Sequence, residues 1–208
     1  MTHDFGLFSA SERCDEPRII VLTAPSGTGK TTIARRVLET FPEMRFSVSA
    51  TTRAPRPHET DGVDYHFVSE DRFLELVRAG EMLEYEEVYP GVFYGTLRSD
   101  VGASSTASPV LLDIDVRGAL SVKAVFGVEA LTIFIAPPDL DELSRRLRGR
   151  GTEDPHSLET RLVRAGEELT FADRFDSRVV NDDLARATAE TVRLVRSFLE
   201  GKSIEGEA

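Results

Sequence analysis

A short run rich in glycine and hydroxyl side chains, residues 24–32, has the residue types and spacing needed to bind phosphate. It reads Ala-Pro-Ser-Gly-Thr-Gly-Lys-Thr-Thr. Backbone N–H groups in such a loop, together with the N-terminus of a following helix, form a cradle for anions. Lys30 would reach the β- and γ-phosphates of a nucleotide, and Thr31 would offer its hydroxyl to Mg²⁺. The pattern predicts ATP binding through Ala24, Pro25, Ser26, Gly27, Thr28, Gly29, Lys30, Thr31 and Thr32.

The first position of this loop departs from the usual pattern. The pattern asks for glycine five residues before Gly29, and Ala24 stands there. Alanine tolerates a positive φ angle poorly, so the backbone at this position must be one that alanine adopts. An ordinary glycine-rich turn is the alternative interpretation, and the strand and helix patterns on either side of the loop argue against it.

Arginines occur in two further places where they could act on phosphate. Arg53 and Arg56 lie three residues apart in a loop stiffened by prolines, and two guanidinium groups held in this way can grip one phosphate. Arg146 and Arg150 lie four apart where a helix is expected to end, and Arg161 lies on the next predicted helix. These three could neutralise the charge of a phosphoryl group during transfer, although the helix dipole alone also favours arginine at a helix C-terminus.

Two aspartates stand at the end of a strongly apolar run, at positions 113 and 115. If both lie on one strand, their side chains leave the same face at its C-terminal end, near the phosphate loop. Asp113 would then act on Mg²⁺ through water. Two carboxylates at an exposed strand end are the alternative, which fits poorly after so apolar a run.

Apolar patterns predict an alternation of strands and helices around these motifs. A β-branched run at 18–23 indicates a buried strand before the phosphate loop, and helical spacing from Thr31 to Phe41 follows it. Two later helices, beginning after Asp139 and near Leu184, are expected to bury Leu140 and Leu184. Further strands are expected at 110–116, 131–136 and 178–180, and further helices between residues 116 and 131 and after Asp154.

Residues 46–96 read differently, as a small β-rich insertion. Phe46, Val48 and Ala50 alternate as in a strand, and Ser69 can cap a short helix that ends near Gly80. The remaining strand candidates are residues 65–68, 82–88 and 92–94, the last two joined through a Pro-Gly turn.

The composition indicates an ordinary globular protein. The chain has 208 residues, 40% hydrophobic and 29% charged, and no apolar run approaches the roughly 20 residues of a membrane span. A net charge of −11 disfavours nucleic acid or anionic membrane as partners. The N-terminus does not resemble a secretory signal, and the single cysteine, Cys14, and the scattered histidines suggest neither a disulfide nor a metal site. We expect a cytoplasmic protein.

Several motifs together resemble the guanylate kinase family. They are far more specific than a phosphate loop alone, and they run in family order through about residues 17–200. The resemblance implies an α/β fold with a P-loop NTPase-type parallel sheet flanked by helices, a small mixed β-rich GMP-binding insertion and a helical lid. It also implies transfer of the γ-phosphate of ATP to GMP with Mg²⁺. Beyond the phosphate loop, the motifs are residues 49–57, 61–67, 91–96, 112–119, 133–138, 146–152 and 180–183.

The resemblance assigns roles to single residues. The carboxylate of Glu84 would accept hydrogen bonds from N1–H and the exocyclic amine of guanine, and adenine would leave it unpaired. Ser49 and Thr96 would help to hold the base, and Asn181 would join the ATP-binding residues. The GMP-binding residues implied are Ser49, Arg53, Arg56, Tyr65, Glu84, Tyr94, Thr96 and Asp115; the catalytic residues are Lys30, Arg146, Arg150 and Arg161; and the metal-binding residues are Thr31 and, through water, Asp113.

The predicted organisation is a single domain, residues 17–204, between tails at 1–16 and 205–208. Its core comprises about 17–46, 97–136 and 171–204, with a GMP-binding insertion at about 47–96 and a lid at about 137–170. We expect a monomer or homodimer whose partners are ATP and GMP. Two alternatives remain. One is a related protein-interaction module without activity, against which the intact phosphate loop and the lid arginines argue. The other is a kinase of a ribose bisphosphate, against which Glu84 argues together with Ser49 and Thr96.

Overall fold

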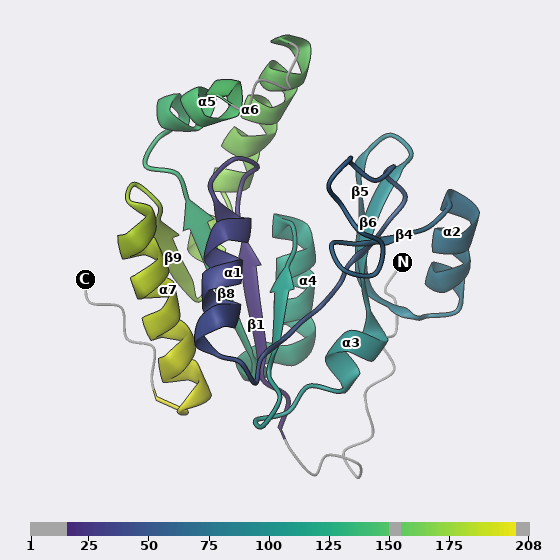
Figure 1. Ribbon diagram of the computed structural model, residues 1–208, viewed down its shortest axis with the longest axis vertical. Coiled ribbons are helices and arrows are strands. Elements are labelled where there is room, and N and C mark those ends of the chain that lie inside the picture. The colour runs from purple at the N-terminus through teal and green to yellow at the C-terminus, as the bar shows by residue number, and fades with distance from the viewer. Residues whose placement is uncertain (1–15, 150–154, 203–208) are drawn as a thin grey trace.

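A computed structural model describes residues 16–149 and 155–202, with no side chains described at 155–158. Its centre is a five-stranded parallel sheet in the order β2-β7-β1-β8-β9 (Figure 1). The strands of this sheet are β1 (Ile19–Thr23), β2 (Arg45–Phe46), β7 (Val110–Asp113), β8 (Ala130–Ala136) and β9 (Ser177–Val180).

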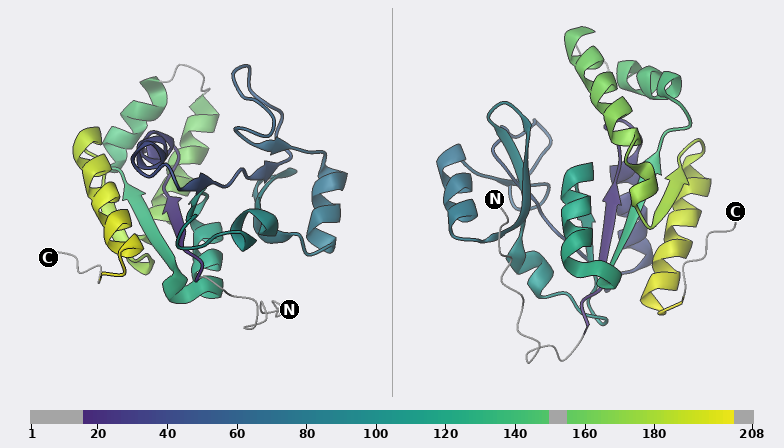
Figure 2. Two further views of the ribbon diagram at one scale, coloured as in Figure 1. Left: turned by 60° about the horizontal axis from the view of Figure 1, so that its bottom comes forward. Right: turned by 180° about the vertical axis from the view of Figure 1, so that it is seen from behind.

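Strand β1 is buried on both faces, as its β-branched run predicts. Ile20 and Leu22 pack with helices α1 (Lys30–Thr40) and α7 (Leu184–Leu199), while Ile19 and Val21 pack with helix α4 (Val116–Phe126) on the other face (Figure 2). Successive side chains of a strand point to opposite faces, so a fully apolar strand suits a sheet covered by helices on both sides.

A second, mixed sheet lies beside the central one, in the order β4-β3-β6-β5. Helix α2 packs Phe73 into its core, and Ser69 caps this helix by accepting a 3.2 Å hydrogen bond from the Arg72 N–H. The expected strand through Phe46 and Ala50 is wrong, because the two residues belong to different sheets. The elements of this unit are β3 (Ala50–Thr51), β4 (His66–Phe67), α2 (Glu70–Arg78), β5 (Met82–Tyr89) and β6 (Val92–Leu97). Helix α3 (Arg98–Gly102) follows β6 and packs Val101 into the core of the central sheet.

Helices α5 (Leu140–Gly149) and α6 (Pro155–Leu169), here called the lid helices, project beyond the central sheet (Figure 1). Asp139 accepts a 2.6 Å hydrogen bond from the Glu142 N–H, which confirms the predicted cap. Leu143 and Leu147 are fully buried, but Leu140 is 44% exposed, contrary to expectation. The predicted cap at position 154 lies outside the described residues.

The two aspartates do not share a strand as predicted. Strand β7 ends at Asp113, and Asp115 is the N-cap of helix α4. Its Oδ1 accepts hydrogen bonds from the N–H groups of Arg117, at 2.8 Å, and Gly118, at 3.0 Å. The expected strand over 110–116 is wrong at its end, because the capping bonds start a helix immediately after β7.

Helix α7 closes the chain against the central sheet. It buries Ala187, Leu194 and Val195, whereas Leu184, which was expected in the core, is 44% exposed. Two short 3₁₀ helices, Gly127–Glu129 and Ala172–Arg174, precede β8 and β9. Within residues 16–149 and 155–202, no helix is long and apolar enough to cross a membrane.

Candidate active site

The phosphate loop connects β1 to α1 through two glycines in left-handed conformations. Gly27 has φ 96° and Gly29, which immediately precedes α1, has φ 94°. Side chains with a Cβ adopt such angles only with strain. Among the described residues, only glycines have a positive φ, so Ala24 fits its position without strain. Alanine in place of glycine at position 24 is therefore compatible with the conformation of the phosphate loop.

Buried polar groups hold the loop from behind. The Asn181 side-chain amide donates a 2.6 Å hydrogen bond to the Thr28 carbonyl, and the Thr28 hydroxyl donates one of 2.8 Å to the Pro25 carbonyl. Asn181 is only 3% exposed. The structure thus places this predicted ATP-binding residue on the buried side of the loop, where it braces the backbone.

Lys30 and Thr31 meet Asp113 at the end of β7. The Lys30 ammonium lies 2.6 Å from Oδ1 of Asp113 and donates a 2.6 Å hydrogen bond to the Ile114 carbonyl. The Thr31 hydroxyl donates a 3.2 Å hydrogen bond to Oδ2 of Asp113. The prediction that Asp113 lies near the loop is confirmed, although the strand ends there rather than at Val116.

This hydroxyl and carboxylate suit Mg²⁺, which usually takes one or two protein ligands and completes its shell with water and phosphate oxygens. In the described part of the chain, no group of three or more His, Cys, Asp or Glu side chains could hold a metal by itself. The donor set at Thr31 and Asp113 therefore fits a metal that arrives with a nucleotide.

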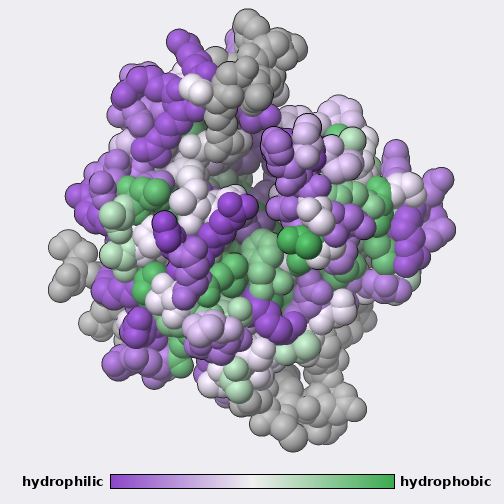
Figure 3. All heavy atoms as spheres, viewed as in Figure 1, coloured by the Kyte–Doolittle hydropathy of each residue, from purple (hydrophilic) through white to green (hydrophobic). Residues whose placement is uncertain are grey.

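A cavity of about 340 Å³ lies between the phosphate loop, the mixed sheet and α6. The space-filling view shows a hollow between the lid helices and the mixed sheet (Figure 3). The cavity joins the loop to most of the predicted acceptor residues. Beyond loop residues 24–32, its lining comprises Ser49, Arg56, Tyr65, Glu84, Val88, Tyr89, Tyr94, Gly95, Asp113, Ile114, Asp115, Arg161, Arg164 and Glu168.

Glu84 is the most buried carboxylate of this cavity, with 8% of its surface exposed. Residue Thr96 lies opposite it on β6 and donates a 2.5 Å hydrogen bond to its Oε1. Burial raises the pKa of Glu84 to about 7, and the bond from Thr96 opposes that rise. Thr96 does not itself line the cavity, so it acts on the site through Glu84.

Two interacting carboxyl groups, those of Glu86 and Asp115, lie near Glu84. Burial, and then the adjacent Asp115 carboxyl, raise the pKa of Glu86 above its ordinary value. Burial alone would raise the pKa of Asp115, but interaction with Glu86 and the N–H of Gly118 lower it. The two carboxyls therefore favour a state in which Glu86 carries a proton and Asp115 a charge.

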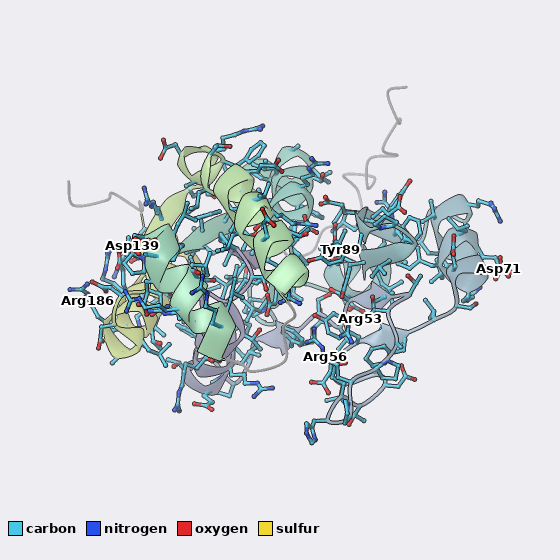
Figure 4. All side chains as sticks on the ribbon, turned by 90° about the horizontal axis from the view of Figure 1, so that it is seen from above. Arg53, Arg56, Asp71, Tyr89, Asp139 and Arg186 are labelled. Carbon is cyan, nitrogen blue, oxygen red and sulfur yellow. The ribbon has the colours of Figure 1, made fainter. Side chains whose placement is uncertain are left out.

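The two loop arginines differ in their surroundings. Arg53 makes two hydrogen bonds to the Glu59 carboxylate, of 2.9 and 2.8 Å, and its Nε donates to the Tyr94 hydroxyl at 3.0 Å. Arg53 lies outside the cavity lining, whereas Arg56 is exposed and lines it. Figure 4 shows both arginines on the side of the mixed sheet that faces the lid helices.

Burial raises the pKa of Tyr65 to about 12, so its hydroxyl stays protonated as a donor.

The predicted lid arginines are not equally close to the cavity. Arg161 lies on α6 with its guanidinium 3.5 Å from the Ser26 hydroxyl of the phosphate loop. Arg146 pairs instead with Glu142 on its own helix, at 2.8 Å, and does not line the cavity. Position Arg150 lies outside the described residues.

Known proteins share this architecture and sequence. The model of the family described as guanylate kinase matches residues 16–198. The chain belongs to the guanylate kinase family. A guanylate kinase from Salinibacter ruber is 64% identical over 181 residues, which cover 87% of this chain and 96% of that relative. One from Chlorobium luteolum is 49% identical over 186 residues, 89% of this chain and 94% of that protein.

A solved guanylate kinase structure has the same fold. The crystal structure from Anaplasma phagocytophilum superposes with a TM-score of 0.73 at 32% identity, covering 88% of this chain and 86% of that one. The predicted fold, a parallel P-loop NTPase-type sheet with helices on both faces, a mixed β-rich insertion and a helical lid, is confirmed.

Several residues of this guanylate kinase site were not predicted from the sequence. Glu86 follows Glu84 by two residues on one strand, so alternation alone places both side chains on one face. Arg164 and Glu168 are spaced four apart on one helix and form a 2.8 Å ion pair. Nothing in the sequence shows that Glu59 folds back onto Arg53, because that contact depends on the path of an irregular loop.

Proposed function

We propose that this guanylate kinase transfers the γ-phosphate of ATP to GMP, giving ADP and GDP, in the cavity between the phosphate loop and the mixed sheet. The observation that carries the proposal is that Lys30 and Glu84 line the same cavity. Lys30 lies where the donor phosphates would bind, and the carboxylate of Glu84 can accept hydrogen bonds from the edge of a guanine base. Family membership supports the same reaction.

On the donor side, loop residues 24–32 bind the ATP phosphates through their backbone N–H groups, and the Lys30 ammonium balances phosphate charge. Lys30 leaves its contact with Asp113 to do so, and Asp113 can then act on Mg²⁺ through water beside the Thr31 hydroxyl. Bound Mg²⁺ supplies positive charge to the phosphate oxygens. Asn181 keeps the loop in its binding conformation through the Thr28 carbonyl.

On the acceptor side, ionised Glu84 accepts the two N–H donors of the guanine edge, with Ser49 beside it and Thr96 fixing its carboxylate. Asp115 contributes a second charge to this end of the cavity. Arg53, Arg56, Tyr65 and Tyr94 bind the GMP phosphate. Arg56 and the two tyrosines line the cavity directly, while Arg53 orients Tyr94 through the 3.0 Å bond between them.

The transfer step depends on position and charge. A GMP phosphate oxygen attacks the γ-phosphorus in line, the bond to the β-phosphate oxygen breaks, and ADP leaves. Arg161, Arg146 and Arg150 offset the negative charge of the transferring group when the lid closes. Closure also keeps water out, since an accessible γ-phosphate would be hydrolysed.

An ADP-release assay with Mg²⁺-ATP and a panel of acceptors tests the proposal. GMP should support fast release, and AMP, CMP, UMP and a ribose bisphosphate should not. ADP release without GMP, equal use of AMP and GMP, or preference for the ribose bisphosphate would contradict it. Absence of any release with all acceptors, in a protein that still binds nucleotide, would favour the protein-interaction alternative.

Within this proposal the insertion at about 47–96 and the lid at about 137–170 are units that move against a core of about 17–46, 97–136 and 171–204. The protein acts in the cytoplasm as a monomer or homodimer with ATP and GMP as its partners. Light scattering with and without substrates would determine the oligomeric state.

A further inference from the structure

We propose that Arg164 is a positioning residue that ties lid helix α6 to the strand carrying Glu84, and thereby couples the position of the lid to GMP binding. The proposal rests on the proposed function of the cavity. It concerns an arginine that the reaction as described above does not use.

Arg164 spans the space between the lid and the mixed sheet. Its Nη1 donates a 2.8 Å hydrogen bond to the carbonyl of Val88, near the end of β5. Its guanidinium carbon lies 5.9 Å from the centre of the Tyr89 ring, within range of a cation–π contact. Figure 4 shows Tyr89 on the edge of the mixed sheet that faces α6. These two contacts join elements that are otherwise separated by the cavity.

Two carboxyl groups set the direction of the guanidinium. Glu168, one turn further along α6, accepts from Nε at 2.8 Å, and Oε1 of Glu86 lies 3.7 Å from Nη2. The Arg164 side chain is 26% exposed and that of Glu168 is 14% exposed, so the pair is held in a partly desolvated place. A planar guanidinium can serve Glu168, Val88 and Glu86 at once because its donors point in fixed, different directions.

The contact reaches the strand that recognises the acceptor. Glu84 and Glu86 are two residues apart in a regularly paired part of β5, so their side chains share one face of the strand. Val88 follows them on the same strand, at a register irregularity between Glu87 and Tyr89. Arg164 approaches the side chain of Glu86 and the backbone of Val88. A movement of α6 is therefore transmitted through Arg164 to β5, the strand that positions Glu84.

The same helix also reaches the donor side. Arg161 precedes Arg164 by three residues, nearly one helical turn, and lies 3.5 Å from the Ser26 hydroxyl. Helix α6 thus contacts the phosphate loop through one arginine and strand β5 through the other. Fixing the helix at β5 places Arg161 over the donor phosphates, and ordering of β5 by GMP favours that placement.

A merely local role for Arg164 predicts different behaviour. An exposed arginine–glutamate pair within one helix adds little to stability. Such a pair does not affect the distance between the lid helices and the mixed sheet. The exposed pair Arg72–Glu75 of α2, at 3.0 Å, is such a pair and provides a matched control. We therefore compare Arg164→Gln with Arg72→Gln, after circular dichroism has shown that both variants are folded.

Spin-label distances measure the coupling without substrate turnover. Val63 and Val163 are 63% and 61% exposed, one beside the mixed sheet and one on α6. Cysteines at these positions, in a Cys14→Ser background, accept labels for pulsed electron resonance. In the ligand-free protein, Arg164→Gln should shift the distance distribution to longer values, while Arg72→Gln should leave it unchanged. GMP alone should shorten the distance more in the unsubstituted protein than in Arg164→Gln.

Kinetics with Mg²⁺-ATP and GMP supply the second readout. Arg164→Gln should raise the KM for GMP about fivefold, the net loss expected for one hydrogen bond, with a smaller change in the KM for ATP. Unchanged label distances in Arg164→Gln would overturn the proposal even if the KM for GMP rose, because Arg164 would then be a simple binding residue. Unchanged KM values would overturn it as well.

The proposed function can fail independently. Lack of GMP-dependent ADP release by the unsubstituted protein contradicts the function, and the label distances in the ligand-free protein still decide whether Arg164 ties the lid to β5.

Discussion

The hydroxyl of Thr96 donates a 2.5 Å hydrogen bond to Oε1 of Glu84, across two paired antiparallel strands. The other carboxylate oxygen of Glu84 lies over Gly118, where any Cβ would collide with it. A neighbouring strand and a glycine in the first turn of α4 therefore fix one buried carboxylate from two sides. This arrangement fixes the position and limits the rotation of the group that we propose to recognise guanine.

Replacing this carboxylate by an amide should abolish selectivity for GMP. In Glu84→Gln the side chain can accept one hydrogen bond but presents an N–H group to a guanine donor. We expect kcat/KM for GMP to fall by roughly 10²-fold or more, with little change in the KM for ATP. Steady-state assays with GMP and AMP check this. Glu81→Gln, at an exposed residue just before β5, is the control; equal losses in both variants would contradict the assigned role.

The burial of Glu84 should make the ligand-free protein less stable as pH rises. Its pKa is raised to about 7 in the folded state from 4.5. Between these values the folded protein holds a proton that the unfolded chain has released, so the free energy of unfolding falls with increasing pH. The contribution of Glu84 should be about 3 kcal/mol over the whole transition. Glu86, whose pKa is also raised, contributes with the same sign.

Urea denaturation from about pH 5 to about pH 8 measures this dependence. Glu84→Gln cannot titrate at this position, so its unfolding free energy should fall less steeply over the same range. An identical slope in both proteins would contradict the shifted pKa. Since GMP requires the ionised carboxylate, the KM for GMP should also rise below about pH 7 in the unsubstituted protein.

The elements around the site could be predicted because each has a local signal. Apolar strand β1, the glycines of the phosphate loop and the Ser69 and Asp139 caps are each read within a few residues. The boundary between β7 and α4 could not, because the apolar run continues through Ile114 and Val116 while capping by Asp115 changes the backbone direction.

The contents of the site were less predictable than the fold around it. Leu140 and Leu184 have helical spacing but begin their helices, and each remains 44% exposed there. Arg53 and Arg56 look equivalent in the sequence, yet only Arg56 lines the cavity. Asn181 reaches the buried side of the phosphate loop because β9 pairs with β8. This pairing joins residues that are distant in the sequence, so no local pattern predicts it.

The close contact between Gly27 and the lid makes this glycine sensitive to substitution. A Cβ at Gly27 would lie 2.8 Å from Cδ2 of Leu147, and the φ of 96° adds backbone strain. Gly27→Ala should therefore displace α5 from the phosphate loop and raise the KM for ATP at least tenfold, with a loss of stability of about 2 kcal/mol. Nucleotide titration and urea denaturation measure the two effects.

Gly80→Ala separates strain from collision. Gly80 also has a positive φ, of 70°, but a Cβ there meets no atom within 4 Å. This variant should lose about 1 kcal/mol of stability from strain and keep its KM for ATP. If Gly27→Ala behaved in the same way, the contact with Leu147 would have no part in holding the lid.

Glu59 should act on GMP binding through the orientation of Arg53. Four of the five guanidinium N–H groups of Arg53 are engaged, two by Glu59, one by the Ala54 carbonyl and one by the Tyr94 hydroxyl. The hydrogen bond from Arg53 lowers the pKa of Glu59, so the pair stays ionised at neutral pH. Glu59→Gln removes the negative charge from this pairing and leaves one of the two Arg53 donors facing an NH₂ group instead of an acceptor. We expect a three- to tenfold rise in the KM for GMP, roughly the net effect of one hydrogen bond, measured by steady-state kinetics.

The matched control for this variant is Glu75→Gln, which breaks the exposed pair with Arg72 and should change neither KM nor stability measurably. Because the pKa of Glu59 is lowered in the folded state, its pairing stabilises the protein above the ordinary pKa of glutamate and is lost as pH falls. The stability difference between the unsubstituted protein and Glu59→Gln should therefore shrink in acid. A rise in KM for GMP without any such difference would mean that Glu59 contacts the substrate instead of holding Arg53, and an unchanged KM would mean that the orientation of Arg53 does not matter for GMP.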